Sequence, residues 1–461
     1  MMAFVLRCGA RHYLPVGDRL LSVLLEVTGD GAEAAGQAPE AAEVILVDCS
    51  GSMSLPPTKL AAARKATSAA VDALRDGVHF ALVQGTGRAH MLYPDRPELV
   101  RATPETRAAA RRATTTMVAS GGTAMGSWLL LARDLLAAHP GAIRHAVLLT
   151  DGQNVGETAA QLDRVLAACT GEFTCDARGI GADWEPRELH RIASALRGRA
   201  DAVRRVGDLA RDFTGMVTEA MRKVVVDVRL RVACEPGVRL CFARQVFPVE
   251  ADLGEPGPEI SAGSWGAGTR HFHLGFEFDG PGEPTGEDLP FADVELAVVP
   301  PGGVTAEPTG QQRRLTVQWT DDSGLSSQYE PVLAHYARQT ELRRLVQAGC
   351  AALDRGEHPD ALDLLGRAVR LAQETGNHEQ LGRLGLLVHV EDAAAGRVRL
   401  REGVSAQELR VAEAGSVLSA FPDLPVEELA ADLPDRVCAC CGLSWPGQAR
   451  FCEETGRELP R

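Results

Sequence analysis

The sequence lacks a long hydrophobic run and an excess of basic residues. No stretch reaches the roughly 18 apolar residues of a membrane-spanning helix, and the apolar start of the chain is too short for a secretory signal. The net charge of -14 argues against nucleic acid or an anionic membrane as a partner, because both need a basic face. We therefore expect a cytoplasmic protein with no membrane span and no nucleic-acid partner.

Two common catalytic motifs are also missing. The sequence contains neither the G-x-S-x-G turn of serine hydrolases nor the G-x-x-x-x-G-K loop of P-loop enzymes. The 11 cysteines are scattered and odd in number. In a cytoplasmic chain this favours thiols or metal ligands over a disulfide framework.

The chain of 461 residues is too long for one core and divides by its patterns. Apolar runs and helical segments alternate in the first half, which predicts an α/β fold with a doubly wound, mostly parallel sheet. Strands separated by Pro/Gly turns follow and predict a β-sandwich into which the α/β domain is inserted. The expected units are N-terminal strands of the sandwich and a linker (1–41), the α/β domain (42–223), the β-sandwich (224–322), a helical region (323–432) and a cysteine-rich tail (433–461).

Two buried strands of the α/β domain are expected to end in an acid. V-I-L-V-D ends at Asp48 and is followed by Ser50 and Ser52, and H-A-V-L-L-T-D ends at Asp151. Between them, the loop S-G-G-T-A-M-G offers Thr123 at the start of a helix. In an open parallel sheet, ligands bind beyond the carboxyl ends of the strands, so these five side chains can converge at one rim.

Two carboxylates and three hydroxyls form an all-oxygen set, which suits Mg²⁺ or Mn²⁺ rather than zinc. D-x-S-x-S at 48–52, the Gly-Gly-Thr loop and L-T-D-G resemble the metal-ion-dependent adhesion site of von Willebrand factor A domains, over about residues 42–223. The resemblance implies that Ser50, Ser52 and Thr123 ligate the metal through their hydroxyls, while Asp48 and Asp151 act directly or through water. It also implies that an acidic side chain of a protein partner fills the remaining position.

The tail contains a possible zinc site. Cys438 and Cys441 resemble one zinc knuckle, and Cys452 belongs to a second one whose last ligand position holds Thr455. A structural zinc site needs four nitrogen or sulfur ligands, so Cys440 would have to be the fourth. The alternative is a degenerate ribbon without zinc. The layout as a whole resembles actinobacterial von Willebrand factor A proteins with such a tail, often encoded beside Ser/Thr kinases and metal-dependent phosphatases.

The sequence thus predicts a metal-dependent binding or scaffold protein rather than an enzyme. A metal-dependent phosphoesterase at the same rim is the alternative, but no histidine adjoins the three motif segments as a general base. A purely structural cation is a third possibility. His271 and His273 alternate on one strand and are interpreted as an exposed face, and Cys49 as a packing residue.

Overall fold

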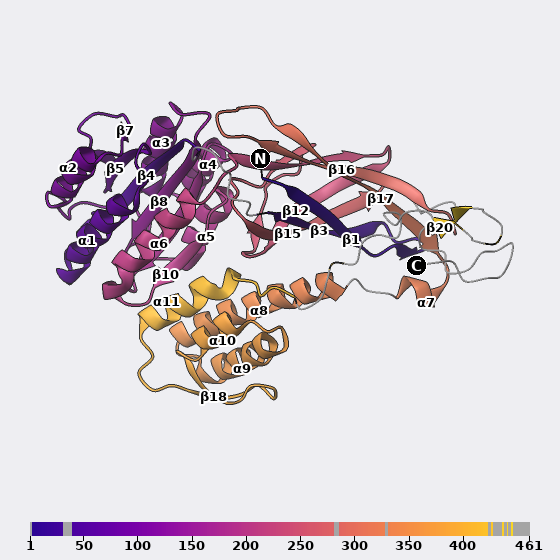
Figure 1. Cartoon of the computed structure of the whole chain (residues 1–461). Helices are drawn as coiled ribbons and strands as arrows, with labels where there is room; N and C mark the ends of the chain where they lie inside the picture. Colours follow the sequence, from indigo (N-terminus) through magenta and orange to yellow (C-terminus); the bar gives the residue numbers. More distant parts are fainter. Residues whose placement is uncertain are drawn as a thin grey trace.

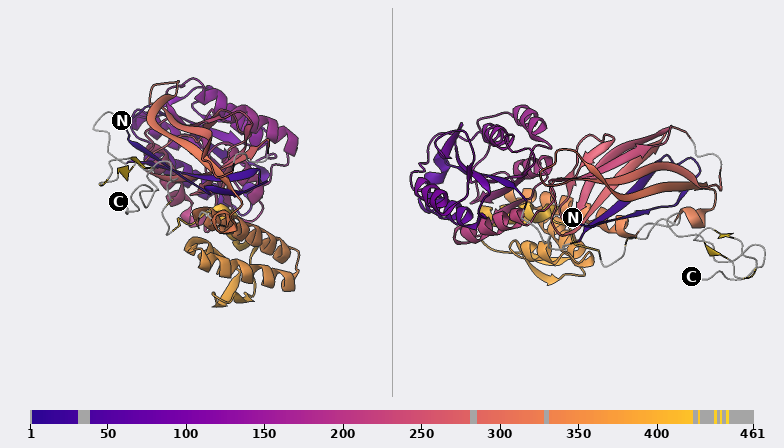
Figure 2. Two further views of the ribbon diagram at one scale, coloured as in Figure 1. Left: turned by 90° about the vertical axis from the view of Figure 1, so that its right-hand side faces the viewer. Right: turned by 45° about the horizontal axis from the view of Figure 1, so that its top comes forward.

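The computed structural model describes residues 2–30, 39–280, 285–327, 331–422 and 426, together with 436–437, 440 and 444–445 of the tail. Figure 1 shows an α/β part on the left, a two-sheet part on the right and a helical part below them. In the right view of Figure 2 the helical part lies at the junction of the other two. Within the described residues, no helix has the length and apolar character needed to cross a membrane.

The α/β part is built on one mixed, mostly parallel sheet in the order β10-β9-β8-β4-β5-β6, with β7 pairing to β5. The strands from β10 to β5 are parallel, and β6 and β7 pair antiparallel with β5. The strand bounds are β4 (Ala41–Asp48), β5 (His79–Gly85), β6 (Ala89–Tyr93), β7 (Val100–Arg101), β8 (Ile143–Thr150), β9 (Thr174–Ile180) and β10 (Ala200–Val203).

Helices cover both faces of this sheet, as the sequence predicted. Every residue of β4 is buried, with Ile45 and Val47 in one hydrophobic core and Val44 and Leu46 in the other. This explains the continuous apolar run, because a central parallel strand needs apolar side chains on both faces. The first core contains α1 (Thr58–Ala73), α2 (Pro104–Thr114) and α6 (Leu209–Met221), and the second α3 (Met125–Leu136), α4 (Ala159–Cys169) and α5 (Pro186–Ala195).

The two-sheet part contains strands from both sides of the α/β part. One sheet has the order β1-β3-β15-β12-β13 and the other β14-β11-β16-β17-β2. The α/β part therefore lies between two segments of one sandwich. The bounds are β1 (Phe4–Ala10), β2 (Tyr13–Pro15), β3 (Leu20–Gly29), β11 (Asp227–Cys234), β12 (Val238–Phe247), β13 (Ala251–Asp252), β14 (Glu259–Ser261), β15 (Gly268–Phe278), β16 (Leu289–Val299) and β17 (Glu307–Thr320).

The C-terminal part is helical but also contains a hairpin. The sequence predicted a helical region over residues 323–432, but a helix within it ends at Leu384 and a strand follows. Alternating side chains and a turn through Gly396, at φ +68, favour the hairpin. The bounds are α7 (Ser323–Ser326), α8 (Pro331–Asp354), α9 (His358–Glu374), α10 (His378–Leu384), β18 (Val388–Asp392), β19 (Arg397–Leu400), α11 (Ala406–Ala414), and, in the tail, β20 (Arg436–Val437) and β21 (Ser444–Trp445).

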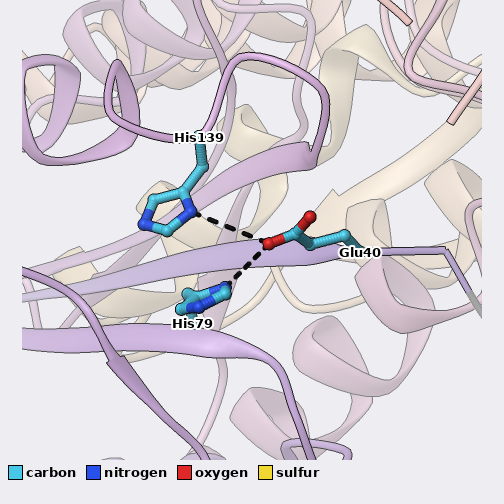
Figure 3. Close-up of side chains that lie close together, drawn as sticks. All are labelled: Glu40, His79 and His139. Atoms are coloured by element: carbon cyan, nitrogen blue, oxygen red, sulfur yellow. Dashed lines mark ion pairs between the residues drawn. The ribbon is translucent and has the colours of Figure 1, made fainter. Parts of the chain in front are cut away.

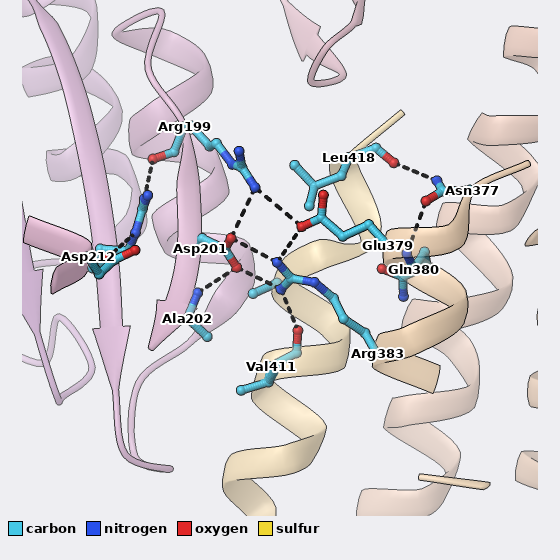
Figure 4. A network of polar contacts seen from close by, with 12 residues as sticks. Arg199, Asp201, Ala202, Asp212, Asn377, Glu379, Gln380, Arg383, Val411 and Leu418 are labelled. Atoms are coloured by element: carbon cyan, nitrogen blue, oxygen red, sulfur yellow. Dashed lines mark hydrogen bonds and ion pairs between the residues drawn. The ribbon is translucent and has the colours of Figure 1, made fainter. Parts of the chain in front are cut away.

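Polar contacts join the helical part to its neighbours. Figure 4 shows Arg383 of α10 against Asp201 of β10, with Arg199 and Glu379 beside them. On the sandwich side, the hydroxyl of Tyr336 in α8 lies 2.6 Å from Nδ1 of His271. The helical part is therefore anchored to both other parts.

The interpretation of His271 and His273 as an exposed face is wrong. His271 is fully buried, and its Nε2 is hydrogen-bonded to Glu26 at 3.0 Å. His273 is partly buried, with Nε2 2.9 Å from Ser22 Oγ, and burial lowers its pKa to about 4. Helix α8 covers this end of the sheet, which strand alternation alone cannot show.

Candidate metal centre

The predicted metal residues lie at the carboxyl edge of the parallel sheet. Asp48 is the last residue of β4, and Asp151 directly follows β8, the neighbouring parallel strand. After Asp48 the chain bends through the short 3-10 helix Gly51–Ser54. The Gly51 amide donates to the Gly121 carbonyl at 2.9 Å, which ties this bend to the loop that carries Thr123.

Oxygen atoms of this loop system converge. Ser50 Oγ lies 2.9 Å from Ser52 Oγ, and the Ser52 hydroxyl donates to Asp151 Oδ1 at 2.6 Å. A methyl carbon placed on Gly152 would lie 3.4 Å from Ser52 Oγ and 3.5 Å from Thr123 Oγ1. The same point lies 3.9 Å from an oxygen of Asp48. Only a glycine leaves this point open, and the structure brings all the predicted oxygen donors to one place.

The carboxylate of Asp48 is fully buried and held by two hydrogen bonds. Its Oδ1 accepts from the Ser50 amide at 2.7 Å, and its Oδ2 accepts from the Thr150 hydroxyl at 2.6 Å. Burial raises the pKa of Asp48, and these two hydrogen bonds oppose the rise. Thr150 was not predicted, although its place one residue before Asp151 put it on the same strand end.

Lys59 is a further member of the site that sequence reasoning missed. Its ammonium group lies 2.7 Å from Asp151 Oδ2 and 3.4 Å from Asp183, and only 7% of the residue is exposed. Burial alone would lower the pKa of Lys59, but the hydrogen bond to Asp151 and its charge outweigh burial and raise the pKa. The site therefore contains a fixed positive charge beside its second carboxylate.

The oxygens open into a shallow cavity of about 520 Å³. Its wall includes Asp183 and, from α11 of the helical part, Arg410. The Arg410 side chain is held by Glu413, at 3.5 Å, and by the Ala182 carbonyl, at 3.5 Å. Among the described residues that line the cavity there is no histidine or cysteine. The lining thus offers hard oxygen donors and one cationic side chain at the rim.

The residues present fit a hard divalent cation. Mg²⁺ prefers oxygen ligands and retains several waters, and the donors here are hydroxyls and carboxylates without a nitrogen or sulfur ligand. When bound, such a cation would polarise an incoming oxygen ligand as a Lewis acid. Ser52 donates its proton to Asp151 and therefore accepts from Ser50, so one lone pair of the Ser52 oxygen stays available to a cation.

The remaining predicted residues are the cysteines. Cys440 lies in an exposed turn of the tail, and Cys438, Cys441 and Cys452 lie outside the described residues. Cys49 is fully buried, and burial raises its thiol pKa to about 12, which confirms that it is a packing residue.

A doubly wound sheet with a D-x-S-x-S loop, a Gly-Gly-Thr loop and an acid at the end of the neighbouring parallel strand defines an α/β domain of the adhesion-site class. The profile of the von Willebrand factor type A domain matches residues 42–202. The structure of a von Willebrand factor type A protein from Catenulispora acidiphila is 36% identical, with a TM-score of 0.80 over 91% of this chain and 97% of that chain. The chain belongs to the von Willebrand factor type A family. Domains of this family often bind divalent cations at this edge of the sheet and typically serve in metal-dependent protein interactions.

Two more distant structures share the fold. The ArnB paralog VWA2 from Sulfolobus acidocaldarius is 12% identical, with a TM-score of 0.57 over 91% of this chain and all of that chain. The human COPII-coat protein Sec24c is 11% identical, with a TM-score of 0.50 over 86% of this chain and 60% of that chain. No curated protein matches the sequence significantly.

Proposed function

We propose that this edge of the sheet binds Mg²⁺ or Mn²⁺ and uses it to capture an acidic side chain of a partner protein. The observation that carries the proposal is the convergence of Ser52, Thr123 and Asp48 around the open point at Gly152. Neutral hydroxyls supply most of the direct donors, so the bound cation stays attractive to a carboxylate. The protein is then a binding or scaffold protein rather than an enzyme.

The charges around the site support a negatively charged ligand. Lys59 offsets one of the two carboxylates through its contact with Asp151. A divalent cation together with Asp48, Asp151 and Lys59 carries a net charge of +1, and Asp183, which contacts Lys59 and lines the cavity, balances it. Arg410 adds a further positive charge at the rim of the same cavity. An acidic side chain would be attracted by both groups, and the shallow rim admits a side chain presented from another protein's surface.

Metal-dependent capture is the test. The full chain is immobilised and exposed to its native cytosol with Mg²⁺ or with EDTA, using wild type, Ser50→Ala/Thr123→Ala and the control Thr116→Ala. Thr116 is an exposed residue of the segment that follows α2. Partners are expected only with Mg²⁺ and only for wild type and the control. The same partners in every lane would show that metal-bridged binding is wrong.

The captured partner then allows a direct test of its acidic residue. Ser/Thr kinases and metal-dependent phosphatases are the first candidates, because the sequence layout resembles that of proteins whose genes often lie beside the genes of such enzymes. One Asp→Asn or Glu→Gln change in the partner should abolish capture while Mn²⁺ binding by this chain, measured by electron paramagnetic resonance, is unchanged. Partner binding that tolerates every such change would contradict carboxylate capture.

The two alternatives have separate outcomes. A phosphoesterase would turn over a generic phosphoester with Mg²⁺ or Mn²⁺, and Asp48→Ala would abolish turnover. If the cation only stabilises the fold, Asp48→Ala would lower the melting temperature while partner capture survives.

A further inference from the structure

A group of side chains of the kinds that can ligate a metal lies at the opposite edge of the same sheet. Figure 3 shows His79, His139 and Glu40 together, with both imidazoles turned toward one carboxylate oxygen. Glu40 Oε1 lies 3.2 Å from His79 Nδ1 and 3.9 Å from His139 Nδ1. One ligand atom from each of the three residues can be chosen so that all lie within 4.8 Å of one another.

Three separate chain segments build this group. Glu40 precedes β4, His79 is the first residue of β5, and His139 lies in the connection between α3 and β8. Ala42 is paired with His79 across the parallel strands, and Glu40, two residues earlier, points to the same face. The group thus lies at the amino edge of the sheet, eight residues from Asp48 along β4, or roughly 26 Å at about 3.3 Å per residue.

The contacts of His79 are not those of an ordinary ion pair. Nδ1 of His79 is buried and lies 3.2 Å from the Glu40 oxygen, yet it has no hydrogen-bond partner among the described residues. The rings of His79 and His139 lie 4.2 Å apart at 31°, so that two imidazoles share one carboxylate. A cation between the three groups would satisfy all of them at once.

We propose that Glu40, His79 and His139 form a binding site for a divalent transition-metal ion, with Zn²⁺ as the fitting ion. Two imidazoles and one carboxylate are the ligand set of open zinc sites, with zinc–ligand distances near 2.0–2.2 Å. Tetrahedral ligand atoms at such distances from zinc lie about 3.4 Å from one another. The side chains of Glu40 and His139 are partly exposed, so their rotation can bring the ligand atoms to this spacing. A fourth position stays open to water or to an outside ligand.

The groups around His79 favour its neutral imidazole, but the positive charge among them also weakens the attraction of the site for a cation. Burial lowers the pKa of His79, and the charge of His139 lowers it further, while Glu40 opposes both. His79 is therefore available without losing a proton at neutral pH. Arg101, paired with His79 across β5 and β7, also lowers this pKa and places a positive charge near the ion. This site shares no residue with the proposed Mg²⁺ site, so each proposal can fail alone.

The test must separate this site from the cysteines and from the oxygen site. The full chain is prepared metal-free, with excess Mg²⁺ and with serine in place of Cys438, Cys440, Cys441 and Cys452. In this background, isothermal titration with Zn²⁺ alone is expected to give one ion per chain. Co²⁺ should give visible absorption without thiolate-to-cobalt charge-transfer bands. A background protein that binds no Zn²⁺ would overturn the proposal.

Single substitutions assign the ligands. His139→Gln and His79→Gln should each weaken Zn²⁺ binding by at least about tenfold, since even outer partners of metal ligands contribute 10–100-fold. The control His90→Gln, at an exposed histidine on β6 of the same sheet, should leave the Zn²⁺ affinity unchanged.

Zn²⁺ should raise the melting temperature of the background but not of His139→Gln. His139→Gln lies in a partly exposed connection, so equal metal-free melting temperatures will show that it folds. Unchanged Zn²⁺ affinity in that folded variant would overturn the assignment. With the cysteines restored, one further Zn²⁺ would indicate the tail site.

Discussion

Arg383 of α10 and Asp201 of β10 form a two-point ion pair, with Nη1–Oδ1 at 2.7 Å and Nη2–Oδ2 at 2.9 Å. Their side chains are only 15% and 11% exposed. The same guanidinium donates to the Val411 carbonyl of α11 at 3.0 Å. One side chain thus joins α10, α11 and the edge strand of the sheet, and the position of α11, which carries Arg410, depends on it.

We expect Arg383→Met to destabilise the protein by about 3 kcal/mol, because the buried carboxylate of Asp201 loses the positive charge that pairs with it most closely. Arg199 still contacts Asp201, at 3.2 Å, so the effect lies at the low end for a buried pair. Denaturant unfolding measures it. The control Arg370→Met removes an exposed contact to Glu374 and should change stability by less than about 1 kcal/mol. Equal effects in both variants would show that the buried pair does not anchor the helical part.

A pH effect is expected from His145, which is fully buried between Glu43 and Asp176. Burial would lower its pKa, but the charge of Glu43 and the hydrogen bonds to both carboxylates raise it to about 9. Because the pKa of His145 is higher in the folded state, its protonation stabilises the protein by up to about 3 kcal/mol at any pH below about 6.5, its pKa in the unfolded state. This contribution is lost as the pH rises through 9. The free energy of unfolding should therefore fall between pH 6.5 and 9.

The variant His145→Asn isolates this effect. Its unfolding free energy should be lower than that of wild type at pH 6, and the difference should shrink toward pH 9. Denaturant titrations across this range measure the difference directly. A difference that stays constant with pH would mean that His145 is neutral in the folded protein.

The sequence predicted the oxygen donors of the site because each follows from local pattern. A strand buried on both faces is a continuous apolar run, and an acid that ends it must lie at the sheet edge. Asp48 and Asp151 meet because β4 and β8 are parallel neighbours. Lys59 could not be found in this way, since its contact depends on how the first turn of α1 approaches the loop after β8.

The other residues named in the two proposals depend on packing between distant segments. Arg410 reaches the rim only because α11 packs beside β10, more than two hundred residues earlier in the chain. His139 and His79 meet through the order of strands in the sheet, which no short motif encodes. The strand at Val388 was missed for a different reason: a short apolar run does not distinguish a strand from the end of a helix.

Lys59→Met should raise the affinity for Mg²⁺ or Mn²⁺ by about tenfold, because it removes a positive charge beside the cation, a change of about 1.4 kcal/mol. Electron paramagnetic resonance of Mn²⁺ measures the affinity. The control Lys65→Met changes an exposed lysine of the same helix and should have no effect. A weaker affinity in Lys59→Met would instead show that the contact with Asp151 orients that carboxylate for the metal.

Arg410→Ala should reduce capture of an acidic partner by about tenfold, because Arg410 lines the cavity. The Mn²⁺ affinity should stay within about threefold, because the Arg410 side chain contacts Glu413 and not the oxygen donors of the site. Arg187→Ala is a matched control: Arg187 lies 3.6 Å from the same Glu413 but does not line the cavity. Surface plasmon resonance at low and high salt compares the variants. The loss in Arg410→Ala should shrink at high salt, because salt screens the attraction between a charge at the rim and an incoming acidic side chain. If both variants lose capture equally, the effect comes from Glu413 and the packing of α11, and Arg410 does not contact the partner.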